Sequence, residues 1–547
     1  MNRWFYLKIM LAGVLFSMFE TAMAQSTILT PGGAVFNNDS TSKTVQLPKL
    51  TYEQIKAIVW PQLQEGMMVY DISSKCVRVY NGSEWICLAD SKSVPFAAPG
   101  YFSTVKSMSS VNYAAYYGYG IGNYELVSDA QNNLYAAGNS SNMSLIGFTC
   151  GGSMDITFNG KPTGYLVKYD SNTQPQWCFS ISGKIISVSP PIFTYSDFYS
   201  SISSVKVSSD AVYVAGHFNN TITLNGIDIS ATGGVDMFIA KLNPVNGAII
   251  WFKKITNGPG NETAVNLQLD DAQNVYVSGI HTSSFVLDGS TNITNNGGSD
   301  FFIAKFNTNG ILQSSIASGG SSDDKIADME WSGSDLIAVG TFTNSLTIGG
   351  VALTGLSGKN LFLARLNNSL AVQNAYSYNT TGVFSVNDIC SSGSGIYVSG
   401  RINGVSQIGT VSYENTGFLA QLNIYSNSTS QVLKLTKGDI SKIGFSGENI
   451  FGIINFSGNS SFENIPIIGT YRSSDVALFK IKSSSNSVKW IKVLGDRDPT
   501  SVAGFDYYER SSHALLVKSS TEILYTISES YMASFKVRSL ELIKYIE

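Results

Sequence analysis

Charged side chains are scarce in this 547-residue chain, where Asp, Glu, Lys and Arg make up 14% of the residues, against about a quarter in an average globular protein. Lys and Arg total 35 and Asp and Glu 39, so the formal net charge is −4, and no basic cluster stands out. A nucleic-acid backbone has to be neutralised by many Lys and Arg side chains. The composition therefore argues against a nucleic-acid partner.

Residues that carry reactive chemistry are also few. The histidines are His217, His281 and His513. Two imidazoles without a carboxylate at fixed spacing are a weak metal signal, so we interpret His217 and His281 as solvated or hydrogen-bonded side chains. No Gly-x-Ser-x-Gly motif is present, and we expect acidic neighbours such as Asp323 and Asp324 to be solvated loop charges. The sequence therefore predicts no catalytic residue, no metal site and no cofactor.

Cysteine occurs five times, which is an odd number. Cys76 and Cys87 flank a turn and predict one disulfide across a hairpin. Cys150 and Cys178 fall within one repeat and predict a second, and we expect Cys390 to be a buried apolar residue. Geometry decides whether either pair can bond.

A long apolar run is missing after the first two dozen residues, so no later segment is expected to span a bilayer. Residues 1–24 carry basic Arg3 and Lys8, an apolar core over 9–19 and small residues at Ala22 and Ala24. This is the pattern of a cleaved secretory signal peptide. It predicts export to the periplasm, the cell surface or the medium, with cleavage between Ala24 and Gln25.

What the chain does have is a repeat. A Phe-Ile-Ala-Lys-like segment recurs with a spacing of roughly 60 residues, which indicates a repeat architecture. It closes at Lys168, Lys241, Lys305, Arg365, Gln421, Lys480 and Lys536. A Val-Tyr-Val-x-Gly-like segment precedes it, starting at Leu134, Val212, Val275, Leu336, Ile396, Ile450 and Ile523. Both segments read as strands.

Each repeat holds two more strand candidates, one before the first segment, as at 265–269, and one after the second, as at 249–253. Four strands in each of seven units, without a helical period between them, predict an all-β, seven-bladed β-propeller of four-stranded antiparallel blades over 101–547. Residues 101–106 are expected to pair with the last blade either in place of residues 543–547 or beyond them.

Turn residues fit this scheme. Segments 129–133 and 270–274 carry Asp and Asn where the first strand turns into the second. Gly-Gly pairs at 233–234 and 297–298 are followed by Asp236 and Asp300. We interpret these aspartates as turn residues in preference to calcium ligands, because no repeat supplies the dense acidic spacing of a calcium loop.

The Gly-Gly-x-Asp-x-Phe-Ile-Ala-Lys pattern, with Val-Tyr-Val-x-Gly upstream, resembles the SBBP-type bacterial β-propeller repeat over about residues 101–547. The resemblance departs in blades six and seven, which lose the glycine after strand two and the Gly-Gly pair. It implies a propeller in an extracytoplasmic setting and no single activity.

Residues 25–46 are polar and are expected to be flexible, and a small α+β module follows over 47–94. Thr51 with Gln54 forms a capping box and Leu50 with Ile55 a hydrophobic staple, so a helix is predicted over 52–60. Strands are predicted at 66–71, 76–80 and 84–88. Residues 47–88 resemble a module found in many exported proteins of Gram-negative bacteria. About forty residues bury little core, so we expect the module to dock on the propeller or to self-associate, with 95–100 as a linker.

Aromatic residues gather before three neighbouring blades and predict one binding patch on the loop-rich side of the ring. They are Tyr113, Tyr116, Tyr117, Tyr119, Phe193, Tyr195, Phe198, Tyr199, Tyr507 and Tyr508. Tyr suits both sugar rings and protein partners, although the same side chains would serve to pack the ring closure or to receive the N-terminal module. The function expected from the sequence is a non-enzymatic exported scaffold that binds a glycan or a surface protein. The alternative is a carbohydrate-active hydrolase or lyase with carboxylates at the propeller channel.

Overall fold

The computed structural model separates the chain into two units, Met1–Phe96 and Ala97–Glu547. The residues that it describes are 47, 49–51, 54–55, 57–58, 67–72, 76–80, 85–87, 101–111, 125–140, 149–150, 154–155, 163–183, 185–189, 192–195, 198–392, 395–408, 411–426, 428–469, 475–494, 508–518, 523–532 and 537–546. Within these ranges, no helix has the length and apolar character needed to cross a membrane. The segment 25–46 and the linker 95–100 lie outside them.

The N-terminal unit is built on a four-stranded sheet whose strands run in sequence order. They are β1 (Lys49–Leu50), β2 (Met68–Asp71), β3 (Cys76–Tyr80) and β4 (Trp85–Cys87). Gln54 and Ile55 are helical, and the predicted capping box is confirmed: Thr51 N donates to Gln54 Oε1 (2.8 Å) and Gln54 N donates to Thr51 Oγ1 (3.3 Å). Most of the helix expected over 52–60 lies outside the described residues.

The two faces of this sheet differ. Ile55, Val69 and Asp71 are buried, and Arg78 Nε donates to Asp71 Oδ2 at 2.7 Å. The opposite face carries Met68 and Tyr70, which pair across the strands with Val79 and Val77. Met68 and Ile72 are exposed by 36% and 45%, so this face, called the apolar face below, is only partly covered within one copy.

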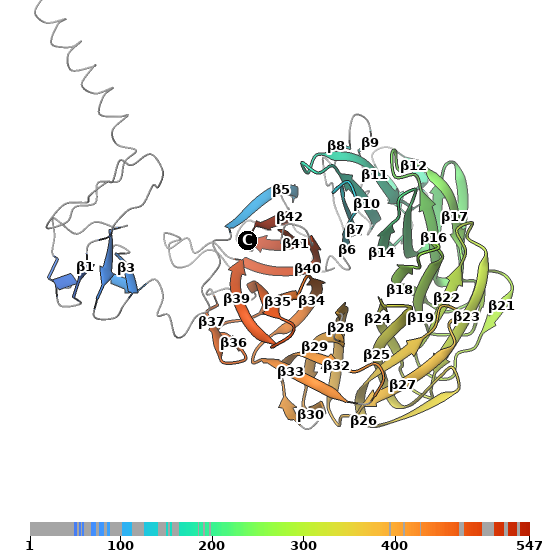
Figure 1. Ribbon diagram of the computed structural model, residues 1–547. Coiled ribbons are helices and arrows are strands. Elements are labelled where there is room, and N and C mark those ends of the chain that lie inside the picture. The colour runs from blue at the N-terminus through green and yellow to red at the C-terminus, as the bar shows by residue number, and fades with distance from the viewer. Residues whose placement is uncertain are drawn as a thin grey trace, which may run out of the picture. The chain divides into compact units, whose positions relative to one another are not determined.

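The C-terminal unit repeats an antiparallel group of four strands, and the groups follow one another around a common centre (Figure 1). In chain order they are β6 (Glu125–Ser128), β7 (Leu134–Ser140), β10 (Thr163–Tyr169) and β11 (Pro175–Ile181); β14 (Ser200–Val207), β15 (Val212–Leu224), β16 (Ile227–Leu242) and β17 (Ile249–Lys254); β18 (Glu262–Leu269), β19 (Val275–His281), β22 (Asp300–Phe306) and β23 (Leu312–Gly319); β24 (Lys325–Ser332), β25 (Asp335–Ile348), β26 (Val351–Leu366) and β27 (Val372–Tyr378); β28 (Val383–Ser392), β29 (Gly395–Asn403), β32 (Gly417–Leu422) and β33 (Thr429–Leu435); β34 (Asp439–Ser446), β35 (Asn449–Phe456), β38 (Asp475–Lys482) and β39 (Ser487–Leu494); and β40 (Tyr508–Lys518), β41 (Ile523–Met532) and β42 (Val537–Ile546) with β5 (Tyr101–Val111).

Short hairpins extend the connections between strands two and three or between groups. They are β8 (Thr149–Cys150) with β9 (Met154–Asp155), β12 (Ile185–Ser189) with β13 (Ile192–Tyr195), β20 (Phe285–Leu287) with β21 (Thr291–Ile293), β30 (Val405–Ile408) with β31 (Val411–Glu414), and β36 (Ser460–Phe462) with β37 (Ile465–Ile467). A few pairings between neighbouring groups join the three groups that begin at β18, β24 and β28, with β36 and β37, into one 14-stranded sheet. The unit is thus all-β where it is described, as the sequence predicted.

First strands meet at the centre of the unit. β6 contacts β14, β14 contacts β18, and the same succession runs on through β24, β28, β34 and β40. β40 in turn contacts β6, and β42 pairs with β5. The last group therefore lies against the first and is completed by a strand from the start of the unit.

The repeated sequence motif is explained by the register of strands two and three. Gly340 pairs with Phe362, and a Cβ at Gly340 would fall 2.1 Å from Lys325 O and 2.6 Å from the Phe362 ring. The ring therefore occupies the space that a side chain at Gly340 would need. Gly216 and Gly279 face Phe238 and Phe302 in the same way.

The group that begins at β34 keeps this contact although the sequence lacks the expected glycine. Gly452 pairs with Phe479, so the glycine lies two residues earlier on β35 and the phenylalanine two residues later on β38 than in the other repeats. A Cβ at Gly452 would fall 2.3 Å from Phe479 Cζ. The glycine–phenylalanine contact has moved rather than disappeared. This accounts for the departure of that repeat from the sequence pattern.

Tyr and Lys of the motif also pair across strands two and three. The Lys241 ammonium lies 5.2 Å from the centre of the Tyr213 ring, and Lys305 lies 5.0 Å from that of Tyr276, which are cation–π distances. Asp270 Oδ1 accepts from Asn274 N (2.8 Å), and Asp270 Oδ2 accepts from the Tyr276 hydroxyl (3.1 Å). The interpretation of segment 270–274 as an Asx turn is therefore confirmed.

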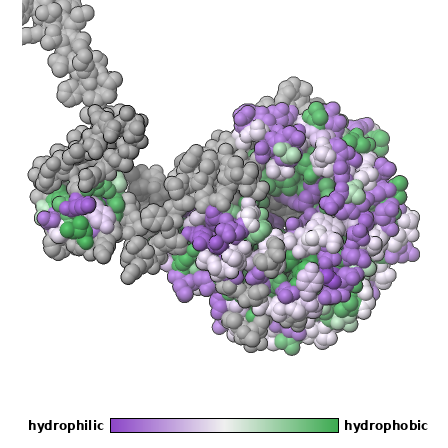
Figure 2. Space-filling view, in the orientation of Figure 1, coloured by the Kyte–Doolittle hydropathy of each residue, from purple (hydrophilic) through white to green (hydrophobic). Residues whose placement is uncertain are grey.

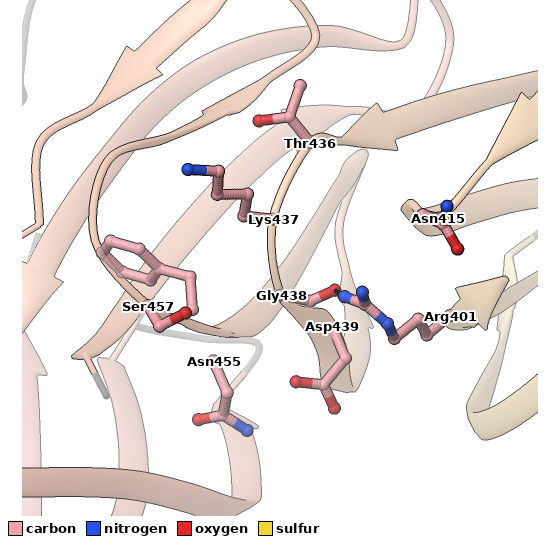
Figure 3. Close-up of a pocket in the computed structure, with 9 residues that line it drawn as sticks. Arg401, Asn415, Thr436, Lys437, Gly438, Asp439, Asn455 and Ser457 are labelled. Carbon is pink, nitrogen blue, oxygen red and sulfur yellow. Dashed lines mark hydrogen bonds between the residues drawn. The ribbon is translucent and has the colours of Figure 1, made fainter. Parts of the chain in front are cut away.

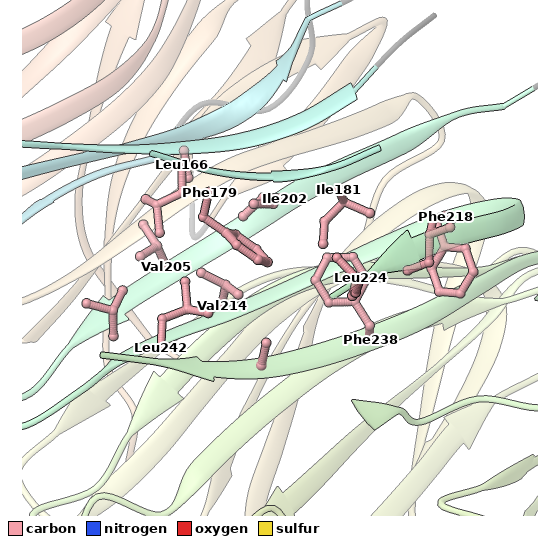
Figure 4. Close-up of a cluster of buried hydrophobic side chains, with 14 of the residues drawn as sticks. Leu166, Phe179, Ile181, Ile202, Val205, Val214, Phe218, Leu224, Phe238 and Leu242 are labelled. Carbon is pink, nitrogen blue, oxygen red and sulfur yellow. The ribbon is translucent and has the colours of Figure 1, made fainter. Parts of the chain in front are cut away.

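Hydrophobic cores lie between successive groups, because each sheet is buried on both faces. One cluster joins β10 and β11 to β14, β15 and β16 through side chains such as Leu166, Phe179, Ile202, Val214 and Phe238 (Figure 4). Further clusters join the later groups pairwise. On the visible surface the described residues mix polar and apolar side chains (Figure 2).

The last group departs from the prediction. Ile546 pairs with Ile523, so residues 543–546 belong to the third strand β42 and not to an outer strand, and the alignment of Lys536 with the repeat is wrong. Leu542, opposite Ile527, takes the register position of Phe302. Residues 101–106 pair beyond residues 543–546, with Lys544 opposite Ser103, which was one of the two expected arrangements.

Replacing Gly452 with Ala is expected to lower the free energy of unfolding by about 1–3 kcal/mol, because the new methyl group overlaps the Phe479 ring. A second change, Phe479→Leu, removes that overlap, so the double variant should lose less than the sum of the two single variants. Urea unfolding of the four proteins measures this coupling. Strictly additive losses would contradict the contact.

Candidate functional site

A β-bulge recurs at one place in the first strands of the groups. β14, β18, β24, β28 and β34 each shift register against their second strand at the same step, and β40 shifts one position away. The residues that follow the bulge in the first five are Ser204, Asn266, Asp328, Asp388 and Lys442, and Glu125 on β6 holds the same register position. We call these the inner-ring residues.

Side chains of the inner ring bind the backbone of the next group. In four groups the amide after the inner-ring residue donates to the inner-ring side chain of the preceding group. Four such bonds join Val205 N to Glu125 Oε2 (2.5 Å), Leu267 N to Ser204 Oγ (3.0 Å), Ile389 N to Asp328 Oδ2 (3.3 Å) and Ile443 N to Asp388 Oδ2 (2.7 Å). A first strand has a free edge at the centre, and these bonds satisfy some of its amides.

Lysine side chains balance the charge of some inner-ring carboxylates. Lys206 pairs with Glu125, and Lys442 Nζ lies 2.8 Å from Asp388 Oδ1. Burial and the charge of Asp388 raise the pKa of Asp328 well above its ordinary value. Burial raises the pKa of Glu330 to about 7, against the opposing charge of Lys206. The centre thus holds two carboxyl groups, Asp328 and Glu330, whose neutral forms are favoured by burial.

These carboxyl groups are the residues that the sequence reading missed. Their hydrogen bonds indicate a structural role. Asp328 accepts from Asn266 Nδ2 (2.6 Å), Met329 N (2.8 Å) and Ile389 N. In the described part of the chain no three His, Cys, Asp or Glu side chains are placed to hold a metal ion. The sequence did hold one signal for this cluster. Asp328 and Glu330 are two residues apart in a predicted strand, so their side chains share one face of the sheet.

A cleft of about 580 Å³ opens at the boundary between the groups that begin at β28 and β34 (Figure 3). It is formed where β29 and β35 end and where β33 leads into β34. Its lining is polar apart from Phe456, and consists of Arg401, Asn415, Thr436, Lys437, Gly438, Asp439, Asn455, Phe456 and Ser457. This volume suits a small ligand or a short segment of a polymer.

Gly438 contributes only its backbone to the cleft. In register, Gly438 stands where Glu262, Asp324 and Phe384 stand at other boundaries, and all three of those side chains are buried. Gly438 adopts a φ of +117°, and a Cβ there would fall 2.2 Å from Asn455 O. A larger residue is therefore excluded by both conformation and space.

Opposite charges meet across the floor of the cleft. Arg401 Nη1 donates to Gly438 O (2.6 Å), and Arg401 Nε donates to Asn403 Oδ1 (2.8 Å). Burial raises the pKa of Asp439, against the opposing charge of Arg401, and Asn387 Nδ2 donates to Asp439 Oδ2 (3.1 Å). Lys437 and Ser457 are exposed at the rim. The cleft offers donors and acceptors of several kinds with little net charge.

The predicted aromatic patch lies largely outside the residues whose side chains are described, namely Tyr113, Tyr116, Tyr117, Tyr119, Phe193, Tyr195, Tyr507 and Tyr508. Of the remaining two, Phe198 is buried in the core between the first two groups. The hydroxyl of Tyr199 lies 3.0 Å from His217 Nε2. Both therefore take part in packing within the unit.

The histidines and aspartates that the sequence analysis named also lie inside the C-terminal unit. His217 and His281 are buried, and His281 Nδ1 lies 3.0 Å from Ser283 O. Asp236 Oδ2 accepts from Thr232 N (2.7 Å) and Asp300 Oδ2 accepts from Asn296 N (2.5 Å), in line with their interpretation as turn residues. The expectation that Asp324 is a solvated loop charge is wrong, since Asp324 is fully buried.

The structure tests part of the cysteine predictions. Cys390 is buried and free, as expected. Cys178 is disulfide-bonded, and β8, which carries Cys150, contacts β11, which carries Cys178; the pairing of these two remains a prediction. In the N-terminal unit Cys87 is opposite Arg78, so Cys76 lies one diagonal step away, and a bond between Cys76 and Cys87 also remains a prediction.

Comparison with known proteins gives one family match, to a phage tail like trimerisation region over residues 26–104. No curated protein matches the chain. Solved structures that are similar in fold include the cobalt-substituted Synechocystis ACO (8% identity, TM-score 0.38, 82% of this chain and 94% of that one) and a subtype N11 neuraminidase-like protein of A/flat-faced bat/Peru/033/2010 (11%, 0.33, 80% and 94%). A Trypanosoma rangeli sialidase mutant is another (9%, 0.35, 82% and 59%). Likeness this remote carries no functional argument.

Replacing Asp388 with Ala is expected to lower the free energy of unfolding by about 2–3 kcal/mol, because Ile443 N and the Lys442 ammonium both lose their acceptor. Glu448→Ala is the control: Glu448 pairs with Lys482 at 3.2 Å but is 65% exposed, so its loss should cost less than about 1 kcal/mol. Denaturant unfolding compares the two. Equal losses would contradict a structural role for the inner ring.

Proposed function

We propose that the chain is an exported, non-enzymatic binding scaffold whose C-terminal unit is a seven-bladed β-propeller of the SBBP-repeat type. The contact of β40 with β6 and the pairing of β5 with β42 support the closure of the ring. The register shared by the glycine–phenylalanine and tyrosine–lysine pairs supports one repeated unit. The signal-peptide pattern of residues 1–24 supports export.

The observation that carries the binding role is the cleft at Gly438. Side chains fill the same register position at other boundaries, whereas here the backbone is left open to a space lined by guanidinium, ammonium, amide, hydroxyl and carboxyl groups. Mixed donors and acceptors match the hydroxyl groups of a sugar, because each hydroxyl both donates and accepts. We therefore assign the cleft to a segment of a glycan.

The N-terminal unit would bring several copies of this cleft into one assembly. Its match to a trimerisation region supports association of three copies through residues 26–104. The apolar face offers a surface for that association, since Met68 and Ile72 remain exposed within one copy and exposed apolar surface of this kind favours burial against a partner. Three weak clefts on one assembly would bind a repetitive polymer with much higher avidity than one.

A second candidate function is a carbohydrate-active hydrolase that uses the central carboxyl groups. The proximity of Asp328 to Asp388 and the pKa of about 7 at Glu330 favour it. Against it, Asp328 and Asp388 are both buried and bonded to backbone amides of the next group, which leaves little freedom to act on a substrate. The scaffold is the better supported reading.

Changing Lys437 to Glu is expected to weaken binding to an array of immobilised glycans by about tenfold, or about 1.4 kcal/mol, because the change reverses a charge at the rim of the cleft. Lys489→Glu reverses an equally exposed lysine on β39 and serves as the matched control. Unchanged glycan binding by the Lys437 variant, with both variants folded, would contradict the assignment of the cleft.

Changing Ile72 to Asp is expected to convert a trimer into monomers, because a carboxylate would be buried in the apolar interface. Sedimentation velocity of the full chain measures the mass of the assembly. Ile250→Asp is the control, since Ile250 is similarly exposed (52%) but lies on β17 of the other unit. A monomeric unmodified protein, or a trimer that survives the Ile72 change, would count against association through this face.

A further inference from the structure

Two fully buried carboxyl groups lie together at the boundary between the groups that begin at β18 and β24. Asp300 begins β22, and Asp324 precedes β24. One oxygen of each is bonded: Asp300 Oδ2 accepts from Asn296 N (2.5 Å), and Asp324 Oδ1 accepts from Thr343 N (3.2 Å). The other oxygens, Asp300 Oδ1 and Asp324 Oδ2, are buried and meet no donor in hydrogen-bond geometry within the described ranges. The Gly320 backbone N–H is close enough to lower the pKa of both groups, but it carries no full positive charge.

The two unpartnered oxygens face the same short stretch of backbone. A Cβ at Gly319 would fall 2.2 Å from Asp300 Oδ1, and a Cβ at Gly320 would fall 3.0 Å from Asp324 Oδ2. Burial raises the pKa of Asp324 to about 7, and the charge of Asp300 adds to this effect. Two carboxylates cannot both remain charged in such a place unless something positive accompanies them.

Neighbouring charges do not supply that positive group. Asp323 bonds to Ser299 N and Ser299 Oγ, and Lys325 and Lys359 act on Asp323. Among the described residues neither Asp300 nor Asp324 forms an ion pair within 4 Å. With both groups ionised, the pair would therefore carry an unbalanced charge in a buried position.

The preceding boundary shows how the same arrangement is balanced. Asp236 and Glu262 hold the register positions of Asp300 and Asp324. There Lys254 Nζ lies 2.9 Å from Asp236 Oδ2, and Thr256 Oγ1 donates to Asp236 Oδ1 (3.2 Å). A lysine ammonium therefore accompanies the acid pair.

At the boundary with Asp300 both of those donors are missing. The register of β22 with β23 puts Ala317 where Lys254 stands, and Gly319 follows where Thr256 stands. At the next boundary the aspartate itself is replaced by Asn360, whose side chain is neutral and accepts from Leu356 N and Thr380 N. Of these three related places, only the one with Asp300 keeps two acids and no cation of its own.

We propose that Asp300 and Asp324 bind a hard divalent cation of the calcium class, in the place where Lys254 puts its ammonium at the preceding boundary. All the unpartnered donors are carboxylate oxygens, which calcium prefers and zinc does not. Two carboxylates supply a minority of the six to eight oxygens around calcium, so water completes the shell. The affinity expected is therefore weak, with a Kd on the order of 10⁻⁴–10⁻³ M, as in extracellular calcium modules.

The test is thermal unfolding of the full chain at pH 7.5, after removal of metal with a chelator, with and without millimolar CaCl2. Calcium should raise the melting temperature of the unmodified protein. Asp324→Asn should abolish this rise while leaving the protein folded, since an asparagine amide can donate to Asp300 Oδ1 as the protein's own Asn360 donates elsewhere. Glu262→Gln, the matched change at the boundary that has Lys254, should retain the full rise.

Three results would overturn the proposal. The first is an unmodified protein that does not respond to calcium, which would mean that the pair shares a proton instead. The second is a calcium response of the same size in the Asp324 variant. The third is loss of the response in the Glu262 variant, which would place the effect elsewhere. Glycan binding by the cleft at Gly438 is a separate measurement, so failure of one proposal is distinguishable from failure of the other.

Discussion

The structure of the C-terminal unit depends on how the innermost strand of each sheet satisfies its free edge. A first strand has a partner on one side only, and the amides on its other side face the crowded centre, where an unpaired N–H is costly. Side chains of the preceding sheet provide the acceptors: Glu125, Ser204, Asp328 and Asp388 each receive an amide from the next group. In β14, β24 and β28 a bulge lies directly before the inner-ring residue and turns that side chain toward the neighbouring strand.

Within this frame, single register positions decide what each boundary between sheets can do. Glycine at 438 leaves a cleft where Glu262 and Phe384 fill the space. Alanine at 317 leaves an acid pair without the ammonium that Lys254 supplies one boundary earlier. Beside Ala317 the contacts Gly279–Phe302 and Tyr276–Lys305 are kept, and in the group after Gly438 a glycine–phenylalanine contact persists at Gly452 and Phe479. Function can therefore vary at one boundary while the sheets on either side keep their packing.

Much of the fold was readable from the sequence because strands two and three carry residue types fixed by packing. Position 340 must be glycine because the Phe362 ring lies against it, and the Lys305 ammonium lies over the Tyr276 ring. The last group was misaligned because its third strand has Leu542 and Tyr545 where other repeats have phenylalanine and lysine. The inner ring could not be predicted, since its residues include Glu, Asp, Ser, Asn and Lys and share only a register position. The cleft likewise has no sequence motif, because Gly438 contributes only backbone to it.

Hydrogen exchange at single-amide resolution tests the central claim most directly, because exchange reports whether an amide is bonded in the folded protein. The amides of Val205, Leu267, Ile389 and Ile443 lie on edges that would exchange quickly if only solvent faced them. The account predicts protection comparable to that of amides in the second strands, such as Val214 and Val277. Rapid exchange at these four positions, in a protein whose second strands remain protected, would contradict it.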